Sequence, residues 1–180
     1  MRATEFTPLE GEIERKNRLL ARRRIRAGIG TRHVYGYEKK YLNTLRELAK
    51  QRSLSELLPI ANTVWEEHYH GQRRIPKIRF GPGTKELGYP LSYTLGYSLI
   101  ELAPGQRDIL TLIHELVHAI GPSLHGINFT RVYYNILKNY LPSDEVRDEV
   151  RNVLITKHEK LLSPYYKKLK QASQMSEGNI

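Results

Sequence analysis

The chain of 180 residues has no cysteine, two methionines and one tryptophan. Without cysteine it cannot form disulfides, a zinc ribbon or a cysteine nucleophile. No stretch of the sequence approaches the ~18 consecutive apolar residues that a membrane-spanning helix requires. The first residues, Met1 to Phe6, lack the apolar segment of a signal peptide. From these absences we expect a cytoplasmic protein that does not enter a membrane.

Acidic residues are also scarce relative to basic ones. The chain has 19 acidic and 29 basic residues, and its net charge is +10. This excess favours polyanionic partners, with nucleic acid first, although a basic surface that is simply solvated would have the same composition. The length suffices for one domain with a core.

The most informative stretch is His114-Glu115-Leu116-Val117-His118. Two histidines four residues apart on a helix lie about 40° apart around its axis, so both imidazoles leave from one face. This arrangement suits two ligands of a tetrahedral zinc ion, and His125 supplies a third. Glu115 is placed to act as the general base on a water molecule at the metal. The pattern therefore predicts a catalytic zinc site with one open position.

The surroundings of the motif agree with this interpretation. Gly121 and Pro122 are expected to end the helix and turn the chain back so that His125 reaches the metal. The alternative is a helix with two hydrogen-bonded core histidines and a solvated glutamate. The apolar face of the predicted helix is formed by Ile109, Leu110, Leu112, Ile113, Leu116, Val117 and Ile120.

Together with His125-Gly126-Ile127-Asn128-Phe129, the motif resembles the zinc-binding core of SprT-like and WLM metalloproteases. In those families the third histidine is followed four residues later by an aromatic residue, which here is Phe129. The resemblance covers about residues 76–141. The spacing before His125 lies between the longer insert of SprT-like proteins and the shorter one of WLM proteins. Met1 and Met175 are far from the site, which excludes the Met-turn of metzincins.

The resemblance implies a single α+β, zincin-like domain, in which a small antiparallel or mixed sheet packs against helices with the motif helix at the centre. It implies zinc held by His114, His118 and His125, and a catalytic Glu115. The implied activity is hydrolysis of protein or peptide substrates, including proteins bound to DNA. A small protein of this kind suits a bacterium or a phage.

Three other interpretations are open at this point. A YbeY-like metal-dependent ribonuclease also uses three histidines and a basic surface, but its motif lacks a glutamate at the position of Glu115. In a basic nucleic-acid-binding or phage-type structural protein the zinc would be purely structural. That protein would need a fourth ligand, for which the candidates are His68, His70 and His158. A gluzincin-type peptidase would take its third ligand from Asp144, Glu145 or Glu149.

Residues 1–30 are predicted to form a basic N-terminal helix or arm, ended by Gly28 and Gly30. It could contact nucleic acid, or pack on the core with its charges solvated. The metallopeptidase domain is expected over residues 31–162, and a basic, polar tail over 163–180. The candidate nucleic-acid-binding residues are Arg15, Lys16, Arg18, Arg22, Arg23, Arg24 and Arg26.

A second helix is predicted from the spacing of Tyr37, Tyr41, Leu45 and Leu48. A third begins either at a capping box of Ser53 and Glu56 or at Pro59.

Strands are predicted over residues 75–80 and 88–102, the strongest being 97–102. We expect an extended substrate to add to the edge of this last strand, along Leu99, Ile100 and Glu101.

After the motif, Asn128 is expected to cap one helix and Ser143 to start the last one. The sequence does not identify the oxyanion donor; the candidates are Tyr93, Tyr97, Arg131 and Tyr133.

Overall fold

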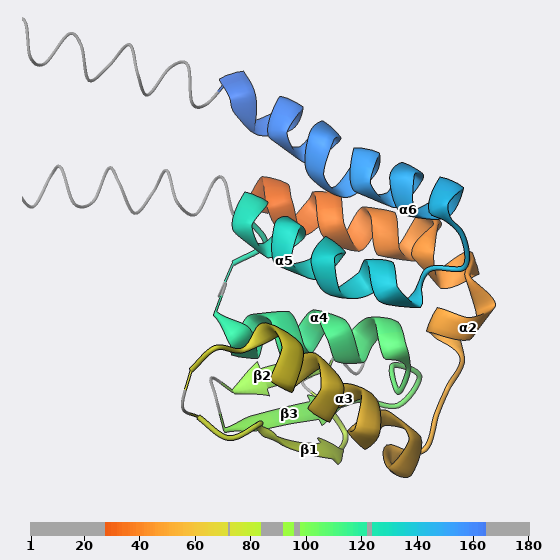
Figure 1. Cartoon of the computed structure of the whole chain (residues 1–180), viewed down its shortest axis with the longest axis vertical. Coiled ribbons are helices and arrows are strands. Elements are labelled where there is room, and N and C mark those ends of the chain that lie inside the picture. The colour runs from red at the N-terminus through yellow and green to blue at the C-terminus, as the bar shows by residue number, and fades with distance from the viewer. Residues whose placement is uncertain (1–27, 72, 84–91, 96–97, 122–123, 165–180) are drawn as a thin grey trace, which may run out of the picture.

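The computed structural model describes residues 28–71, 73–83, 92–95, 98–121 and 124–164 of the chain. They form an α+β structure in which helices pack with a three-stranded mixed sheet (Figure 1). The α+β class and the small mixed sheet expected from the sequence are therefore confirmed. Among the described residues, no helix combines the length and the apolar character needed to cross a membrane.

Along the sequence, some helices come before the strands and the others come after them. A helix over residues 28–40 is followed by the 3-10 turn η1 (Leu42–Thr44), α2 (Arg46–Ala49) and α3 (Leu54–His68). After the sheet come α4 (Ile109–Ile120), α5 (Ile127–Leu137) and the 3-10 turn η2 (Lys138–Tyr140). Finally α6 (Asp144–Arg151) continues through the π-helical stretch η3 (Asn152–Lys157) as far as residue 164. Residues 144–164 thus form one continuous helix.

The sheet has the strand order β1-β3-β2. β1 (Lys77–Phe80) runs parallel to β3 (Leu99–Leu102), and β2 (Tyr93–Leu95) runs antiparallel to it. Because β3 is paired on both sides, it has no free edge, and the expected addition of a substrate along Leu99, Ile100 and Glu101 is wrong. Ile100 and Glu101 are also buried.

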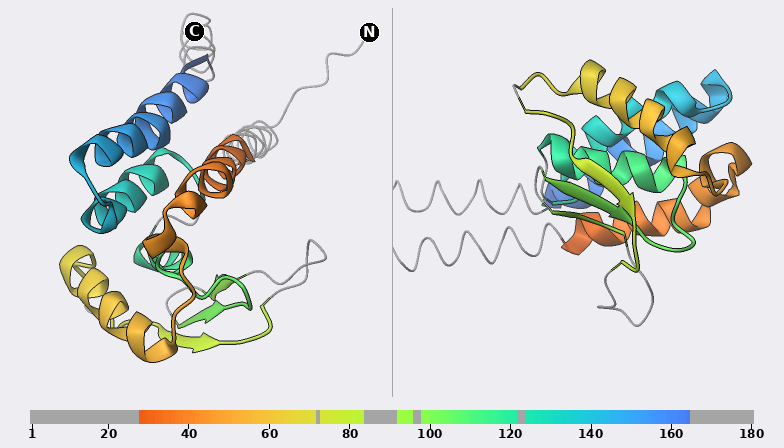
Figure 2. Two further views of the ribbon diagram at one scale, coloured as in Figure 1. Left: turned by 90° about the vertical axis from the view of Figure 1, so that its right-hand side faces the viewer. Right: turned by 90° about the horizontal axis from the view of Figure 1, so that it is seen from below.

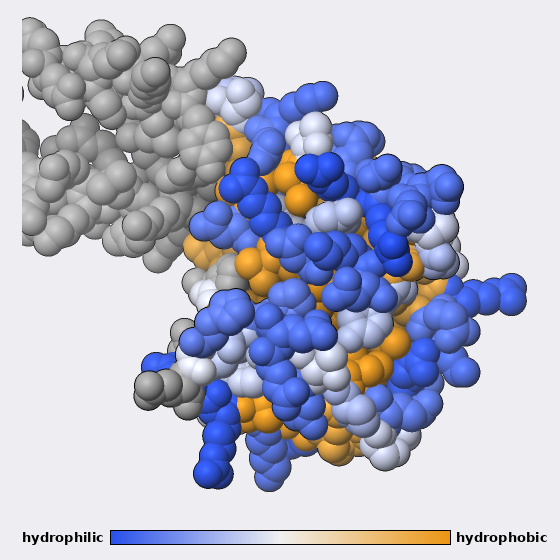
Figure 3. Space-filling view, in the orientation of Figure 1, coloured by the Kyte–Doolittle hydropathy of each residue, from blue (hydrophilic) through white to orange (hydrophobic). Residues whose placement is uncertain are grey.

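The sheet and helix 144–164 lie at opposite ends of the molecule (Figure 2). α4 contacts β2 and β3 on one side and α5 on the other, and α5 in turn contacts η3. α3 packs on α4 and β1. Hydrophilic side chains cover most of the face shown in Figure 3, with apolar surface visible in patches between them. The core side chains of α4 and α5 include Leu112, Ile113, Leu116, Val117, Phe129, Tyr133, Ile136 and Leu137.

Helix 28–40 corrects two expectations. Gly30 does not end a helix, because it lies inside this one, and Gly28 is the first residue of the helix that the structure describes. A β-carbon on Gly30 would approach the carbonyl oxygen of His125 to 1.5 Å, so glycine is needed there for a close approach of two backbones. Tyr37 and Leu48 do not share one helix either, because the chain leaves helix 28–40 at Tyr41 and is extended at Leu45.

The expected caps are partly confirmed. Ser53 precedes α3, and its backbone N–H donates to the Glu56 carboxylate at 2.8 Å, so Pro59 lies within the helix and does not start it. Ser143 caps α6 by accepting a hydrogen bond from the N–H of Val146 at 3.4 Å. Asn128 is not a cap, because α5 already begins at Ile127, after Gly126.

Candidate metal centre

α4 carries both histidines of the motif and is fixed at both ends. Asp108 caps its start by accepting a hydrogen bond from the N–H of Thr111 at 2.7 Å, and Gly121 follows its last residue. Since α4 is apolar on most of its surface, it is buried between the sheet and α5. His114 and Glu115 are consequently buried as well, with exposed fractions of 3% and 6%.

Three imidazole nitrogens meet at one point. His125 Nε2 lies 2.9 Å from His114 Nε2 and 3.2 Å from His118 Nε2. A tetrahedral ion that binds nitrogen at roughly 2.0–2.1 Å holds its ligand nitrogens about 3.3 Å apart. The spacing of these nitrogens is close to that value. The group therefore fits a single metal ion.

Aromatic rings hold the three imidazoles in place. The Phe129 ring lies 4.6–5.0 Å from all three imidazole centroids. The Tyr35 ring stacks on His114 at 5.2 Å and packs on His125 at 5.0 Å. Because Phe129 contacts all three imidazoles and Tyr35 contacts two of them, these rings restrict how the imidazoles can turn.

Glu38, from helix 28–40, contacts the other side of the first histidine. Its Oε1 lies 2.8 Å from His114 Nδ1 and accepts a hydrogen bond from the Tyr133 hydroxyl at 2.7 Å. A carboxylate at Nδ1 favours the tautomer with the proton on that nitrogen and leaves the Nε2 lone pair for a metal. Burial alone would lower the pKa of His114, but the charge and hydrogen bond of Glu38, with the charge of Glu115, raise it.

His125 is in a different electrostatic environment. Burial, together with the charges of His114, His118 and His158, lowers the pKa of His125 to about 3. Its Nδ1 lies 3.3 Å from the Thr31 hydroxyl. The imidazole is therefore neutral at physiological pH, which is the form that binds metal.

Glu115 borders a cavity of about 340 Å³ next to the histidines. The Thr94 hydroxyl, on β2, donates to its Oε2 at 2.6 Å and also lies 2.9 Å from its backbone oxygen. Burial raises the pKa of the Glu115 carboxyl, although His114 and the Thr94 hydrogen bond oppose the shift. His118, His125, Tyr35, Tyr93 and Ser92 line the same cavity. A small ligand there would contact the carboxylate and the imidazoles together.

The structure thus brings together four of the predicted site residues: His114, Glu115, His118 and His125. Sequence reasoning missed the residues that support them, namely Thr31, Tyr35, Glu38 and Thr94. The first three occupy one face of helix 28–40, but no local pattern indicates that this face meets His114.

Of the candidate oxyanion donors, Tyr93 lines the cavity, and its side chain is hydrogen-bonded to Glu101 and Arg79. Tyr133 is buried and bonded to Glu38, and Arg131 pairs with Glu159 at 2.7 Å. Tyr97 lies outside the described residues, as do the basic residues between Arg15 and Arg26.

None of the proposed alternative ligands joins the histidine group, which in the part of the chain described here has three members. His158 instead contacts Thr130, at 3.3 Å, and the His33 ring. The group likewise contains none of the other residues proposed as a third or fourth ligand, which were His68, His70, Asp144, Glu145 and Glu149.

Comparisons of the chain with known protein families, with curated protein sequences and with solved structures found no match.

Proposed function

We propose that the protein is a zinc-dependent metallopeptidase. The observation that carries this proposal is the meeting of three histidine nitrogens beside the Glu115 carboxylate, at a cavity open to a substrate. Three imidazoles without a thiolate are a ligand set typical of catalytic zinc, which keeps a fourth position open. A structural zinc site would need a fourth protein ligand. Among the described residues no fourth ligand joins the histidine group, and this favours a catalytic zinc site.

Bound zinc would polarise the peptide carbonyl and bring the pKa of water to ~7. The proposed catalytic role of Glu115 follows from its contacts. Its Oε2 is occupied by the Thr94 hydroxyl, so Oε1 takes the proton from the attacking water. The raised pKa of the carboxyl lets it hold that proton and pass it to the leaving amine.

Other residues of the chain position these groups. Glu38 holds the His114 imidazole with Nε2 toward the metal position. Tyr93 lines the cavity, but to act as the oxyanion donor it would have to leave its hydrogen bond with Glu101. An extended peptide would add to β2, which among the described residues pairs only with β3 and carries Thr94 beside Glu115.

The sequence resemblance and the net charge of +10 further support an SprT-like, zincin-type enzyme with α4 at its centre, acting on proteins associated with DNA. The test is digestion of casein by the purified protein. Activity should be lost with a chelator and restored by zinc. Activity that a chelator leaves unchanged would exclude a metallopeptidase.

A further inference from the structure

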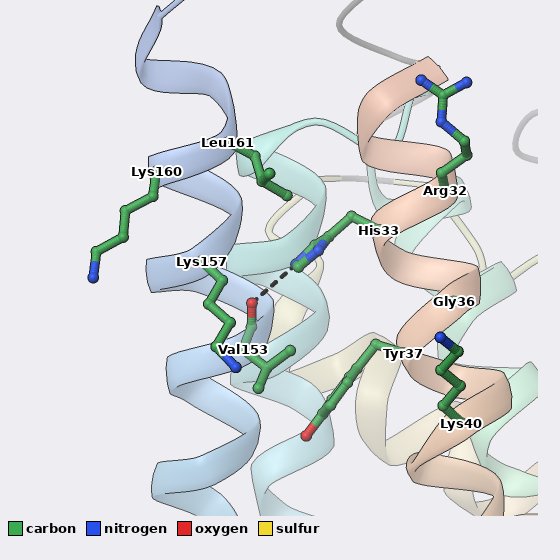
Figure 4. Close-up of a pocket in the computed structure, with 9 residues that line it drawn as sticks. All are labelled: Arg32, His33, Gly36, Tyr37, Lys40, Val153, Lys157, Lys160 and Leu161. Atoms are coloured by element: carbon green, nitrogen blue, oxygen red, sulfur yellow. Dashed lines mark hydrogen bonds between the residues drawn. The ribbon is translucent and has the colours of Figure 1, made fainter.

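A second cavity, of about 580 Å³, lies between helix 28–40 and helix 144–164 (Figure 4). Thr31, Tyr35 and Glu38 turn one face of helix 28–40 toward the histidines. The residues that helix 28–40 gives to the second cavity, which include Gly36 and Lys40, lie on roughly the opposite side of this helix. The groove is therefore separate from the candidate metal centre.

The rim of the groove is basic. Arg32 and Lys40 lie at the rim on helix 28–40, and Lys157 and Lys160 lie at the rim on helix 144–164. Figure 4 shows the Lys157 ammonium near the space between the two helices and the Lys160 side chain extending outward. All four side chains are exposed, none has an ion-pair partner among the described residues, and no acidic residue lines the groove. Four cations without a protein partner around one cavity give it a positive potential that attracts an anionic ligand.

Between the cations the groove is apolar and aromatic. The rings of His33 and Tyr37 project from helix 28–40 toward helix 144–164, which contributes Val153 and Leu161 (Figure 4). His33 Nε2 donates to the Val153 carbonyl at 2.9 Å and so joins the two walls. The Tyr37 hydroxyl is buried and has no hydrogen-bond partner among the described residues, so the part of Tyr37 that faces the groove is its ring.

The spacing of the cations indicates more than one phosphate. Arg32 and Lys40 are eight residues apart, which is about 12 Å along a helix axis. A single phosphate cannot contact both ends of this wall, whereas successive phosphates of a strand can. An apolar, aromatic floor accepts the π-face of an unpaired base, and a basic rim follows the backbone.

We propose that this groove binds single-stranded nucleic acid. One base packs against His33 and Tyr37, and the flanking phosphates contact Arg32 and Lys40 on one wall and the two lysines on the other. Duplex would bind less well, because its bases are stacked and paired and cannot enter the groove.

Gly36 allows a sharp test, because it lines the groove and a β-carbon there would meet no atom within 4 Å. Gly36→Glu places a negative charge in the groove, and Gly36→Gln is its neutral control of the same size. Arg46→Glu, on the exposed side of α2, lowers the net charge by two units, as Lys157→Glu does and by one unit more than Gly36→Glu, so it controls for net charge. Zinc content should be unchanged in all three variants, and no variant should melt at a lower temperature; the two Gly36 variants should melt slightly higher, because glycine is unfavourable inside a helix.

The measurement is fluorescence anisotropy of the full-length protein with a labelled single strand of about 10 nucleotides. We expect Gly36→Glu to weaken binding about tenfold, Gly36→Gln to weaken it less, and Arg46→Glu to change it less than twofold. Lys157→Glu should reproduce the loss, so a folding defect in Gly36→Glu would not prevent the test. The proposal would be overturned if Gly36→Glu and Lys157→Glu both bound the strand within twofold of wild type.

Photocrosslinking with a bromouracil-containing strand locates the site directly. We expect the strand to crosslink to Tyr37 or His33. Crosslinks found only outside the groove would contradict the proposal. The proposal would also be contradicted if free ATP, duplex or anionic lipid vesicles bound more tightly than the single strand and lost this binding in Gly36→Glu.

Discussion

Glu38 Oε1 contacts two groups at once, His114 Nδ1 at 2.8 Å and the Tyr133 hydroxyl at 2.7 Å. All three groups are buried. Glu38 comes from helix 28–40, His114 from α4 and Tyr133 from α5, so this contact fixes the first candidate ligand relative to two other helices.

The first prediction concerns this contact. Glu38→Gln should weaken zinc binding by about 10–100-fold, because a neutral amide can still accept the hydrogen bond from His114 but accepts it more weakly and does not raise the basicity of His114 as a carboxylate does. Tyr133→Phe removes only one hydrogen bond and should have a smaller effect. Competition with a chromophoric chelator measures both affinities. The exposed Glu47→Gln serves as the control, and equal affinities for Glu38→Gln and Glu47→Gln would exclude a role for Glu38 in metal binding.

The second prediction concerns the third ligand. His125→Ala should sharply reduce bound zinc, because only two of the three converging nitrogens remain. His70→Ala, at an exposed position, should retain one zinc ion per chain. Elemental analysis of the purified proteins gives the stoichiometry. If His125→Ala still bound one zinc ion with unchanged affinity, His125 would not be a ligand.

The third prediction concerns the stability of the metal-free protein at low pH. Burial and the charge of His33 lower the pKa of His158 to about 4, from an unfolded value near 6.5. The unfolded chain therefore binds a proton first. The stabilisation is fully present above pH 6.5 and is lost as the pH falls toward 4. The loss amounts to up to about 3 kcal/mol.

The physical cause is that His158 Nε2 is buried without a partner among the described residues, so a proton there would bury an unpaired charge. Urea unfolding with a chelator present, at pH 7 and pH 5, measures the change. His158→Gln should reduce this pH dependence, with the part due to His125 remaining, whereas His70→Gln should leave it as in wild type. A pH dependence that is identical in all three proteins would show that His158 does not titrate in this way.

The fourth prediction concerns the basic N-terminal segment. Deletion should stop at residue 27, because Gly30 and Thr31 contact His125. Removing residues 1–27 should weaken nucleic-acid binding and reduce its dependence on salt, since seven basic residues between Arg15 and Arg26 are lost. Zinc content and hydrolysis of a small peptide should be retained. A lower melting temperature with unchanged salt dependence would mean that this segment packs on the core instead.

The parts of the site that were predictable are those encoded locally. Two histidines four apart, an apolar helix face and a serine cap such as Ser143 involve neighbours within one or two turns. Glu38 lies 76 residues from His114 and Thr94 lies 21 from Glu115, and no local pattern pairs them. Gly30 was misread because a close backbone approach, which is a tertiary requirement, outweighs the tendency of glycine to end helices.

The most direct test of the metallopeptidase proposal is Glu115→Gln. Glutamine has nearly the same shape and can still accept the hydrogen bond from Thr94, but it cannot take a proton from water. We measure zinc content and the rate of peptide hydrolysis on the same preparation. The proposal predicts one zinc ion per chain, an unchanged melting temperature and a rate at least about 100-fold below wild type. A zinc-loaded Glu115→Gln protein that hydrolyses peptides within a few-fold of wild type would contradict it.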